Sequence, residues 1–147
     1  MLISTKGRYA LRVMLELASH EKDEIVPLIT IAQKEQISEK YLESILVVLS
    51  KAGVIDGLRG KGGGYRLNRE PREYPVGEIL RLTERTLAPV SCLECEPNPC
   101  ERAAECKTLP LWERLDALIC EYLDSVSLED LLGTSSLTET ECWNNSN

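Results

Sequence analysis

Four of the six residues 59–64 are glycine, and the other two, Arg59 and Lys61, are basic. The flanking residues 54–58 and 65–67 are short runs typical of β-strands. Glycines at a hairpin tip let the backbone turn sharply and leave nothing bulky beside the basic side chains. The sequence therefore predicts a two-stranded hairpin with an open, basic tip.

A pair of short helices is predicted directly before this hairpin. The first covers residues 28–35 and follows Pro27, a residue that the start of a helix tolerates. The second covers about residues 39–51; Ser38 suits its N-cap, and Gly53 suits the left-handed position after its end. Two helices joined by a tight turn and followed by a hairpin have the order of a winged helix-turn-helix domain.

The remaining segments predict a mainly α fold. Apolar side chains at helical spacing indicate helices over residues 6–19, 77–83 and 111–126. The last of these has an apolar face wide enough to pack on its own domain and on a second copy of the chain. Four prolines and four cysteines make residues 87–110 a loop, and residues 133–147, which are rich in Ser, Thr and Asn, are expected to be disordered.

The net charge of −7 is distributed very unevenly along the chain. Residues 1–70 carry 11 Lys and Arg against 9 Asp and Glu, whereas residues 71–147 carry 6 against 15. The electrostatic field at a surface depends on where the charges lie, so an acidic average does not exclude a nucleic-acid surface in the first half.

Several classes of protein are excluded by what the sequence lacks. The apolar runs are too short to span a bilayer, and residues 1–6 do not resemble the start of a signal peptide, so we expect a cytoplasmic protein without membrane contact. One histidine, no nucleophile–base pair and no cofactor fingerprint argue against an enzyme. Residues 59–64 also lack the Gly-Lys-Ser/Thr ending of a phosphate-binding loop.

Six residues are candidates for contacts to DNA. The start of a recognition helix reaches base edges, and this part of the second helix carries Lys40, Tyr41, Glu43 and Ser44. The Glu43 carboxylate could accept a hydrogen bond from a cytosine amine in the major groove. Arg59 and Lys61 at the hairpin tip suit the minor groove or the phosphates. A solvated helix face and a flexible hairpin are the alternatives.

Four cysteines lie close together in the predicted loop, spaced C-x2-C-x4-C-x5-C: Cys92, Cys95, Cys100 and Cys106. Disulfides are rare in the cytosol, so this spacing indicates metal or redox chemistry. Thiolates hold iron–sulfur clusters, but four of them also hold zinc, and reversible thiol oxidation is the third alternative.

Three other residues are predicted to have no metal-binding role. Cys120, on the long helix, is expected to be a small buried apolar residue. Cys142 lies in the tail, and His20 is expected to be solvated after the first helix.

Three segments together resemble the Rrf2 family of dimeric bacterial winged-helix transcription regulators: LISTKGRYA at 2–10, ISEKYLE at 37–43 and LRGKGGGY at 58–65. The resemblance covers about residues 1–132. It implies that Tyr41, Glu43 and Ser44 lie on the recognition helix and Arg59 on a minor-groove wing. Lys40 replaces a serine of the family, so the base preference is expected to differ.

The resemblance also implies a ligand set for the cysteine loop. Cluster-binding members of the family hold an iron–sulfur cluster with three cysteines, which Cys92, Cys100 and Cys106 match. The fourth ligand differs, because the family's histidine position is Leu109 here, and Arg8 stands where some members have a ligating aspartate. Cys95 or an exchangeable outside ligand could complete the site.

The resemblance and the motifs support a division of the chain into four parts. These are a winged helix-turn-helix DNA-binding region (1–86), a cysteine-rich sensor loop (87–110), a dimerisation helix with a following short helix (111–132), and the tail (133–147). The leading hypothesis is a homodimeric regulator of transcription that binds a pseudo-palindromic site in double-stranded DNA. It senses iron–sulfur status, oxygen or nitric oxide through a 2Fe-2S or 4Fe-4S cluster.

Two other hypotheses remain open. The first is a metal-free regulator, like the CymR branch of the family, signalled by a partner enzyme or by thiol oxidation. The second is a small cluster carrier or electron-transfer protein, which would leave the glycine-rich hairpin without a role.

Overall fold

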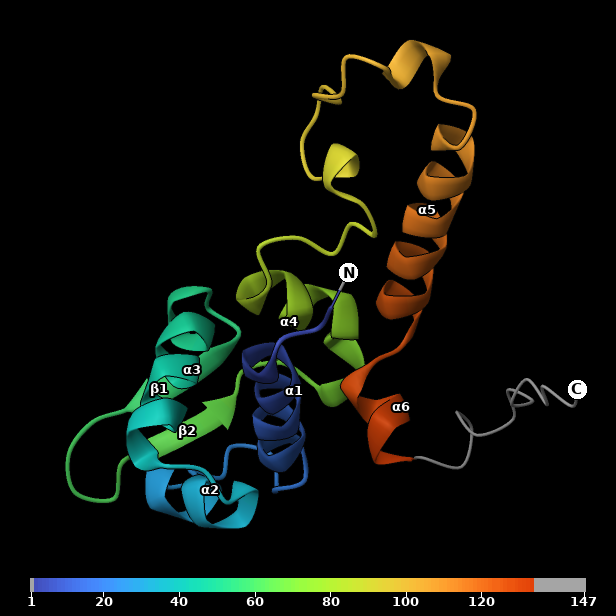
Figure 1. The fold of residues 1–147 in the computed structure, drawn as a ribbon. Helices are drawn as coiled ribbons and strands as arrows, with labels where there is room; N and C mark the ends of the chain where they lie inside the picture. Colours follow the sequence, from blue (N-terminus) through green and yellow to red (C-terminus); the bar gives the residue numbers. More distant parts are fainter. Residues whose placement is uncertain (1, 134–147) are drawn as a thin grey trace, which may run out of the picture.

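The computed structural model describes residues 2–133 (Figure 1). Apart from Gly133, the predicted tail lies outside these residues, and Cys142 lies outside them too. The structure is mainly helical and carries one small sheet of two strands. Its elements are α1 (Thr5–Ala18), α2 (Leu28–Glu35), α3 (Glu39–Lys51), β1 (Ile55–Leu58), β2 (Gly64–Leu67), α4 (Val76–Thr83), α5 (Leu109–Ser125) and α6 (Leu128–Leu132), with 3-10 turns at Pro71–Glu73, Ser91–Leu93 and Ala103–Glu105. The predicted winged-helix fold is confirmed.

The helix-turn-helix begins and ends at the residues that the local sequence favours. The Ser38 side chain accepts a hydrogen bond from the Tyr41 N–H at 3.1 Å and so caps α3. Gly53 follows α3 with φ at +72°, in the left-handed region. Helix α1 starts one residue before its predicted position, because Ser4 caps it through the Gly7 N–H at 3.0 Å.

Strands β1 and β2 form the antiparallel wing, with Ile55 opposite Leu67 and Leu58 opposite Gly64. Val26, just before α2, forms an isolated bridge with Tyr65 through two N–H···O bonds of 2.9 Å. This bridge brings the two backbones together at Gly64, where a Cβ would lie 2.2 Å from the Val26 carbonyl oxygen. The wing is therefore attached to the start of α2 as well as to the end of α3.

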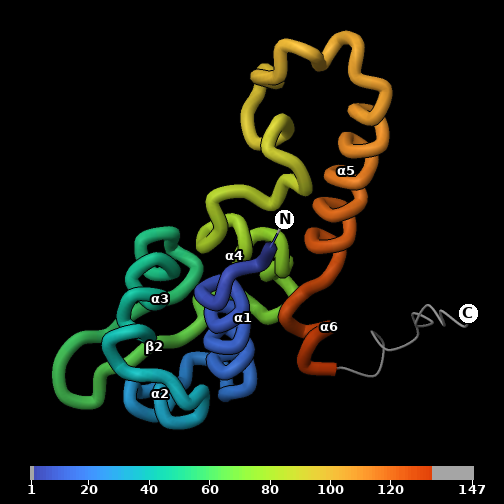
Figure 2. The backbone as a smooth tube through the Cα atoms, viewed as in Figure 1, coloured from blue at the N-terminus to red at the C-terminus, as the bar shows by residue number. Residues whose placement is uncertain are grey.

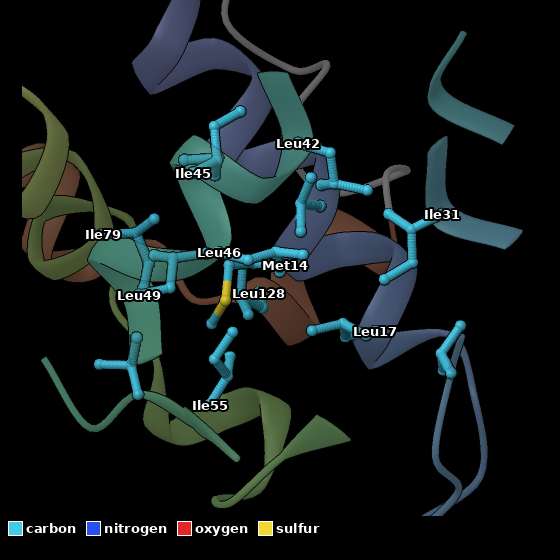
Figure 3. Packing of buried hydrophobic residues seen from close by; sticks show 14 of the residues in the cluster. Met14, Leu17, Ile31, Leu42, Ile45, Leu46, Leu49, Ile55, Ile79 and Leu128 are labelled. Atoms are coloured by element: carbon cyan, nitrogen blue, oxygen red, sulfur yellow. The ribbon is translucent and has the colours of Figure 1, made fainter. Parts of the chain in front are cut away.

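The hydrophobic core lies between α1, α3 and the wing (Figure 3). Met14, Ile45 and Leu46 are completely buried in it. The core also extends beyond the helix-turn-helix and the wing, because Tyr74 and Leu128 are completely buried. The Leu128 N–H donates to the Tyr74 carbonyl at 3.1 Å, so α6 returns to the winged unit at the far end of the chain.

Helix α5 extends away from the winged unit and carries the cysteine loop at its far end (Figures 1 and 2). It begins two residues before its predicted start, with Pro110 in the first turn, where a missing N–H costs no helical hydrogen bond. Asp124 fastens it to α4 by accepting two hydrogen bonds from Arg81, at 2.6 and 2.8 Å. Within residues 2–133, no helix is both long and apolar enough to cross a membrane.

Candidate nucleic-acid interface and cysteine loop

Helix α3 presents an exposed polar face at its N-terminal end. Four of its apolar side chains, Leu42, Ile45, Leu46 and Leu49, are completely buried on one face, which fixes the rotation of the helix about its axis. That rotation leaves Lys40, Glu43 and Ser44 exposed. The Ser44 hydroxyl donates to the Tyr41 carbonyl at 2.6 Å, so it remains available to a ligand as an acceptor.

Tyr41 differs from its three neighbours because its ring is only half exposed. The ring meets Tyr9 of α1 edge to face, with centroids 5.8 Å apart and planes at 88°. Arg12, one turn further along α1, has its guanidinium carbon 5.0 Å from the Tyr9 centroid. Tyr9 lies in the segment 2–10 that carries the family resemblance, but the sequence motifs indicated no role for Tyr9 or Arg12, since a spacing of three residues on a helix is too common to indicate a site.

The tip of the wing is open and basic, as predicted. Gly60 and Gly62 have φ at +93° and +76°, a conformation that other residues adopt only with strain. The Gly63 N–H donates to the Gly60 carbonyl at 2.9 Å and closes the turn. Arg59 and Lys61 are exposed, and neither forms an ion pair with any residue of the described chain. The tip therefore carries two cations that have no ion-pair partner among the described residues. Its backbone extends past α2 and α3 (Figure 2).

The cysteine loop joins the end of α4 to the start of α5. Cys92 lies in the first 3-10 turn of the loop, and Cys106 directly follows the second. All four thiols are free; Cys95 and Cys100 are exposed, and the other two are half exposed. Among residues 2–133, no three His, Cys, Asp or Glu side chains lie close enough to hold one metal ion. The structure thus places the four thiols on one loop without gathering them around a common point.

Polar groups surround the Cys106 sulfur. This sulfur lies 3.3 Å from the Thr108 hydroxyl oxygen. Hydrogen bonds from that hydroxyl and from the backbone N–H groups of Thr108 and Leu109 lower the pKa of Cys106, and the nearby charge of Arg102 acts in the same direction. These contacts favour the thiolate, which is the form that binds metals.

The residue types of the loop fit a metal or iron–sulfur group. Four thiols on an irregular backbone are a suitable donor set for a cluster or for zinc. The Asn98 side chain supports this fit: its Oδ1 accepts from the Cys100 N–H at 2.9 Å, whereas its buried Nδ2 has no acceptor among residues 2–133. A sulfide or thiolate sulfur would supply one. Neither Leu109 nor Arg8 has a side chain that could ligate a metal.

Two expectations about single residues are wrong. His20 is not simply solvated: its Nε2 lies 3.0 Å from Glu16 and its Nδ1 3.0 Å from Glu24. Burial lowers the pKa of His20, but the hydrogen bonds to both carboxylates outweigh this, so the pKa is raised. Cys120 is only half buried, and its thiol lies beside the Arg81 guanidinium.

Comparison with known proteins places the chain among regulators of transcription. Residues 3–134 match the family described as Rrf2, iron-dependent transcriptional regulator. The chain is 42% identical over 131 residues to the HTH-type transcriptional regulator CymR of Bacillus subtilis, covering 89% of each protein. It is 37% identical over 132 residues to the HTH-type transcriptional regulator IscR of Aliivibrio salmonicida, covering 90% of this chain and 77% of that protein.

Solved structures agree with this similarity. The structure of CymR, the global cysteine regulator of B. subtilis, superposes with a TM-score of 0.75 at 39% identity, covering 92% of this chain and 98% of that one. The structure of IscR from T. potens superposes with a TM-score of 0.71 at 35% identity, covering 97% and 93%. Relatives named for two different branches thus match this chain almost equally well.

Proposed function

The chain belongs to the Rrf2 family of transcriptional regulators, and on this premise we propose that it acts as a homodimer that reads a pseudo-palindromic DNA site with α3 and the wing. The observation that carries the proposal is the open wing tip, where Arg59 and Lys61 form no ion pair with the described residues. An unpaired cation on a narrow glycine hairpin suits the minor groove or the phosphate backbone.

Helix α5 supplies the surface for the second copy. Four of its apolar side chains are exposed, namely Leu111, Leu115, Leu118 and Tyr122. They follow one another at helical spacing and form a continuous stripe that the rest of residues 2–133 leaves uncovered. A two-fold pairing along this stripe places two recognition helices about one turn of DNA apart, which is the spacing of a pseudo-palindromic site.

DNA binding is tested by selecting sites from a random duplex library and then measuring affinities for variants. Glu43→Ala is expected to relax base choice at one position of each half-site, because a base-edge contact carries sequence information. Arg59→Ala is expected to weaken binding by about 1–3 kcal/mol per contact and to flatten the salt dependence. Lys51→Ala, at the opposite end of α3, is the control. Failure of the wild-type protein to enrich any site contradicts the proposal.

The sensing function is assigned to the cysteine loop. Cys92, Cys100 and Cys106 would hold an iron–sulfur cluster, with Cys95 or an outside donor as the fourth ligand. When bound, such a cluster provides a centre that responds to oxygen, nitric oxide and iron–sulfur supply. Similarity to a family described as iron-dependent, and to IscR proteins, supports this assignment.

The loop starts at the winged unit and ends in α5, so it can influence DNA binding through both. At its start, the Glu84 carboxylate accepts from the Ser4 N–H at 3.1 Å and from the Ser4 hydroxyl at 2.7 Å. At its end, the loop continues directly into α5. A change in the loop therefore acts on the N-terminus of α1 and on the orientation of α5.

A metal-free regulator is the second candidate, and two observations favour it. The chain is 42% identical to a CymR protein, and within residues 2–133 no three potential ligands lie together. In this case the thiols would act by oxidation, or a partner protein would carry the signal. The Thr108 hydroxyl lowers the pKa of the Cys106 thiol, which would then favour its reactive thiolate form.

Metal analysis separates the two candidates. The wild-type protein, Cys106→Ala and the control Cys120→Ala are purified without oxygen and assayed for iron, sulfide and zinc. The cluster assignment predicts iron and sulfide in the wild type and in the control, and their loss from Cys106→Ala. Zinc without sulfide would instead indicate a structural metal. Negligible metal in all three proteins would favour the metal-free regulator.

A further inference from the structure

The contact between α1 and α2 contains two buried carboxylates, each paired with a cation from the opposite helix. Glu35 of α2 lies with its Oε2 2.5 Å from the Arg12 Nε of α1. In the reverse arrangement, Glu16 of α1 lies with its Oε2 2.8 Å from the Lys34 Nζ of α2. A buried carboxylate is costly without a partner, so both cations stabilise the contact.

The two cations differ in what else they touch. Arg12 also lies over the Tyr9 ring, 5.0 Å from its centroid, and Tyr9 in turn meets the Tyr41 ring edge to face. Lys34 has no ring contact among residues 2–133. Glu35, Arg12, Tyr9 and Tyr41 therefore form a contact chain that runs from α2 through α1 to the recognition helix.

We infer that Arg12 is a positioning residue for DNA recognition, which holds Tyr9 against Tyr41 and so sets the direction of the Tyr41 ring. This inference rests on the proposed DNA-binding function. Its physical basis is that a cation over an aromatic face and an edge-to-face ring pair both depend strongly on geometry. Arg12 restricts the orientation of the Tyr9 ring, and the Tyr9 ring in turn restricts the orientation of the Tyr41 ring.

Arg12 also pairs with the residue at the end of α2, where the chain turns toward the recognition helix. Its partner Glu35 is the last residue of α2, and Gln36 follows with φ at +56°, which reverses the chain toward α3. Tyr41 lies in the first turn of α3, where its N–H is bound by the Ser38 cap. The Arg12 guanidinium therefore contacts Glu35 before this turn. It also contacts the Tyr9 ring, which packs on Tyr41 after the turn.

The test compares two variants that remove one ion pair each from the same helix contact. Arg12→Gln is expected to lower the affinity for the selected site about three- to tenfold, the range expected for losing one cation–π contact and one ordered ring pair. It should also relax the base preference at the same position as Tyr41→Leu. Lys34→Gln, the control, should lose folding stability but retain the wild-type preference. The slope of affinity against salt concentration should remain as in the wild type for Arg12→Gln.

Variants at Tyr9 provide an independent readout should Arg12→Gln not fold. Tyr9→Phe retains the ring and should bind as the wild type does, whereas Tyr9→Leu removes the ring edge and should behave as Arg12→Gln is expected to. Urea unfolding of each variant shows whether it is folded under the binding conditions.

Three results would overturn the inference. Arg12→Gln and Lys34→Gln could change the affinity and base preference equally, which would mean that Arg12 contributes only to folding stability. A flattened salt slope with unchanged base preference would show that Arg12 contacts a phosphate directly. Tyr9→Leu could bind with wild-type preference. If the wild-type protein enriches no DNA site at all, the proposed function itself fails, which is a distinct outcome.

Discussion

One buried hydroxyl holds the two ends of the wing together, and Tyr74→Phe removes it. The Tyr74 side chain is completely buried. Its hydroxyl donates its one proton to the Val54 carbonyl at 2.9 Å, just before β1, or to the Asn68 Oδ1 at 3.0 Å. It accepts from the N–H groups of Asn68 and Arg69 at 3.1 and 3.0 Å, just after β2. The substitution keeps the ring and deletes all of these hydrogen bonds.

The expected loss is about 2–3 kcal/mol of unfolding free energy. Val54 is buried, so its carbonyl cannot reach water, and an unsatisfied buried acceptor costs about 1–3 kcal/mol. Asn68 and Arg69 are more accessible, so their N–H groups can donate to water in place of the deleted Tyr74 hydroxyl. Urea unfolding at one protein concentration measures the change for Tyr74→Phe beside Tyr65→Phe, whose hydroxyl forms no hydrogen bond within the described chain. A loss below about 0.5 kcal/mol, or one equal to that of Tyr65→Phe, would refute the reasoning.

Three further predictions concern the wing, a histidine and the long helix. Gly64→Ala should destabilise the protein by about 1–3 kcal/mol in urea, because the new Cβ would lie 2.2 Å from the Val26 carbonyl oxygen; a stability equal to wild type would show that the bridge to Val26 is dispensable. The raised pKa of His20 means that its contacts to Glu16 and Glu24 stabilise the fold fully below the ordinary value of 6.5, and that this stabilisation is lost as pH rises through the folded pKa. The difference in urea midpoint between wild type and His20→Gln should therefore shrink as pH rises above 6.5, and a difference independent of pH would contradict this assignment. Leu118→Glu should yield a folded monomer in light scattering, since it places a charge in the apolar stripe of α5; a dimer of wild-type stability would exclude this surface.

The sequence by itself determined the elements whose ends depend on neighbouring residues. The Ser38 cap and the left-handed Gly53 limit α3 through contacts within a few residues, so pattern and residue type sufficed to place that helix. The wing was predictable for the same reason, because the positive φ values of Gly60 and Gly62 belong to one tight turn. The exposed start of α3 followed from helical periodicity alone.

Contacts between residues distant in the sequence were decided only by the tertiary structure. Glu35 and Arg12 look like ordinary solvated charges, and no local pattern shows that one becomes buried against the other. Leu128 belongs to a separate segment in sequence but lies in the core of the winged unit, because the chain returns to Tyr74 after α5. The cysteines are close in sequence, yet an irregular loop has no repeating geometry that turns spacing into position. Their arrangement is therefore set by packing and by any group they bind, and not by the local sequence.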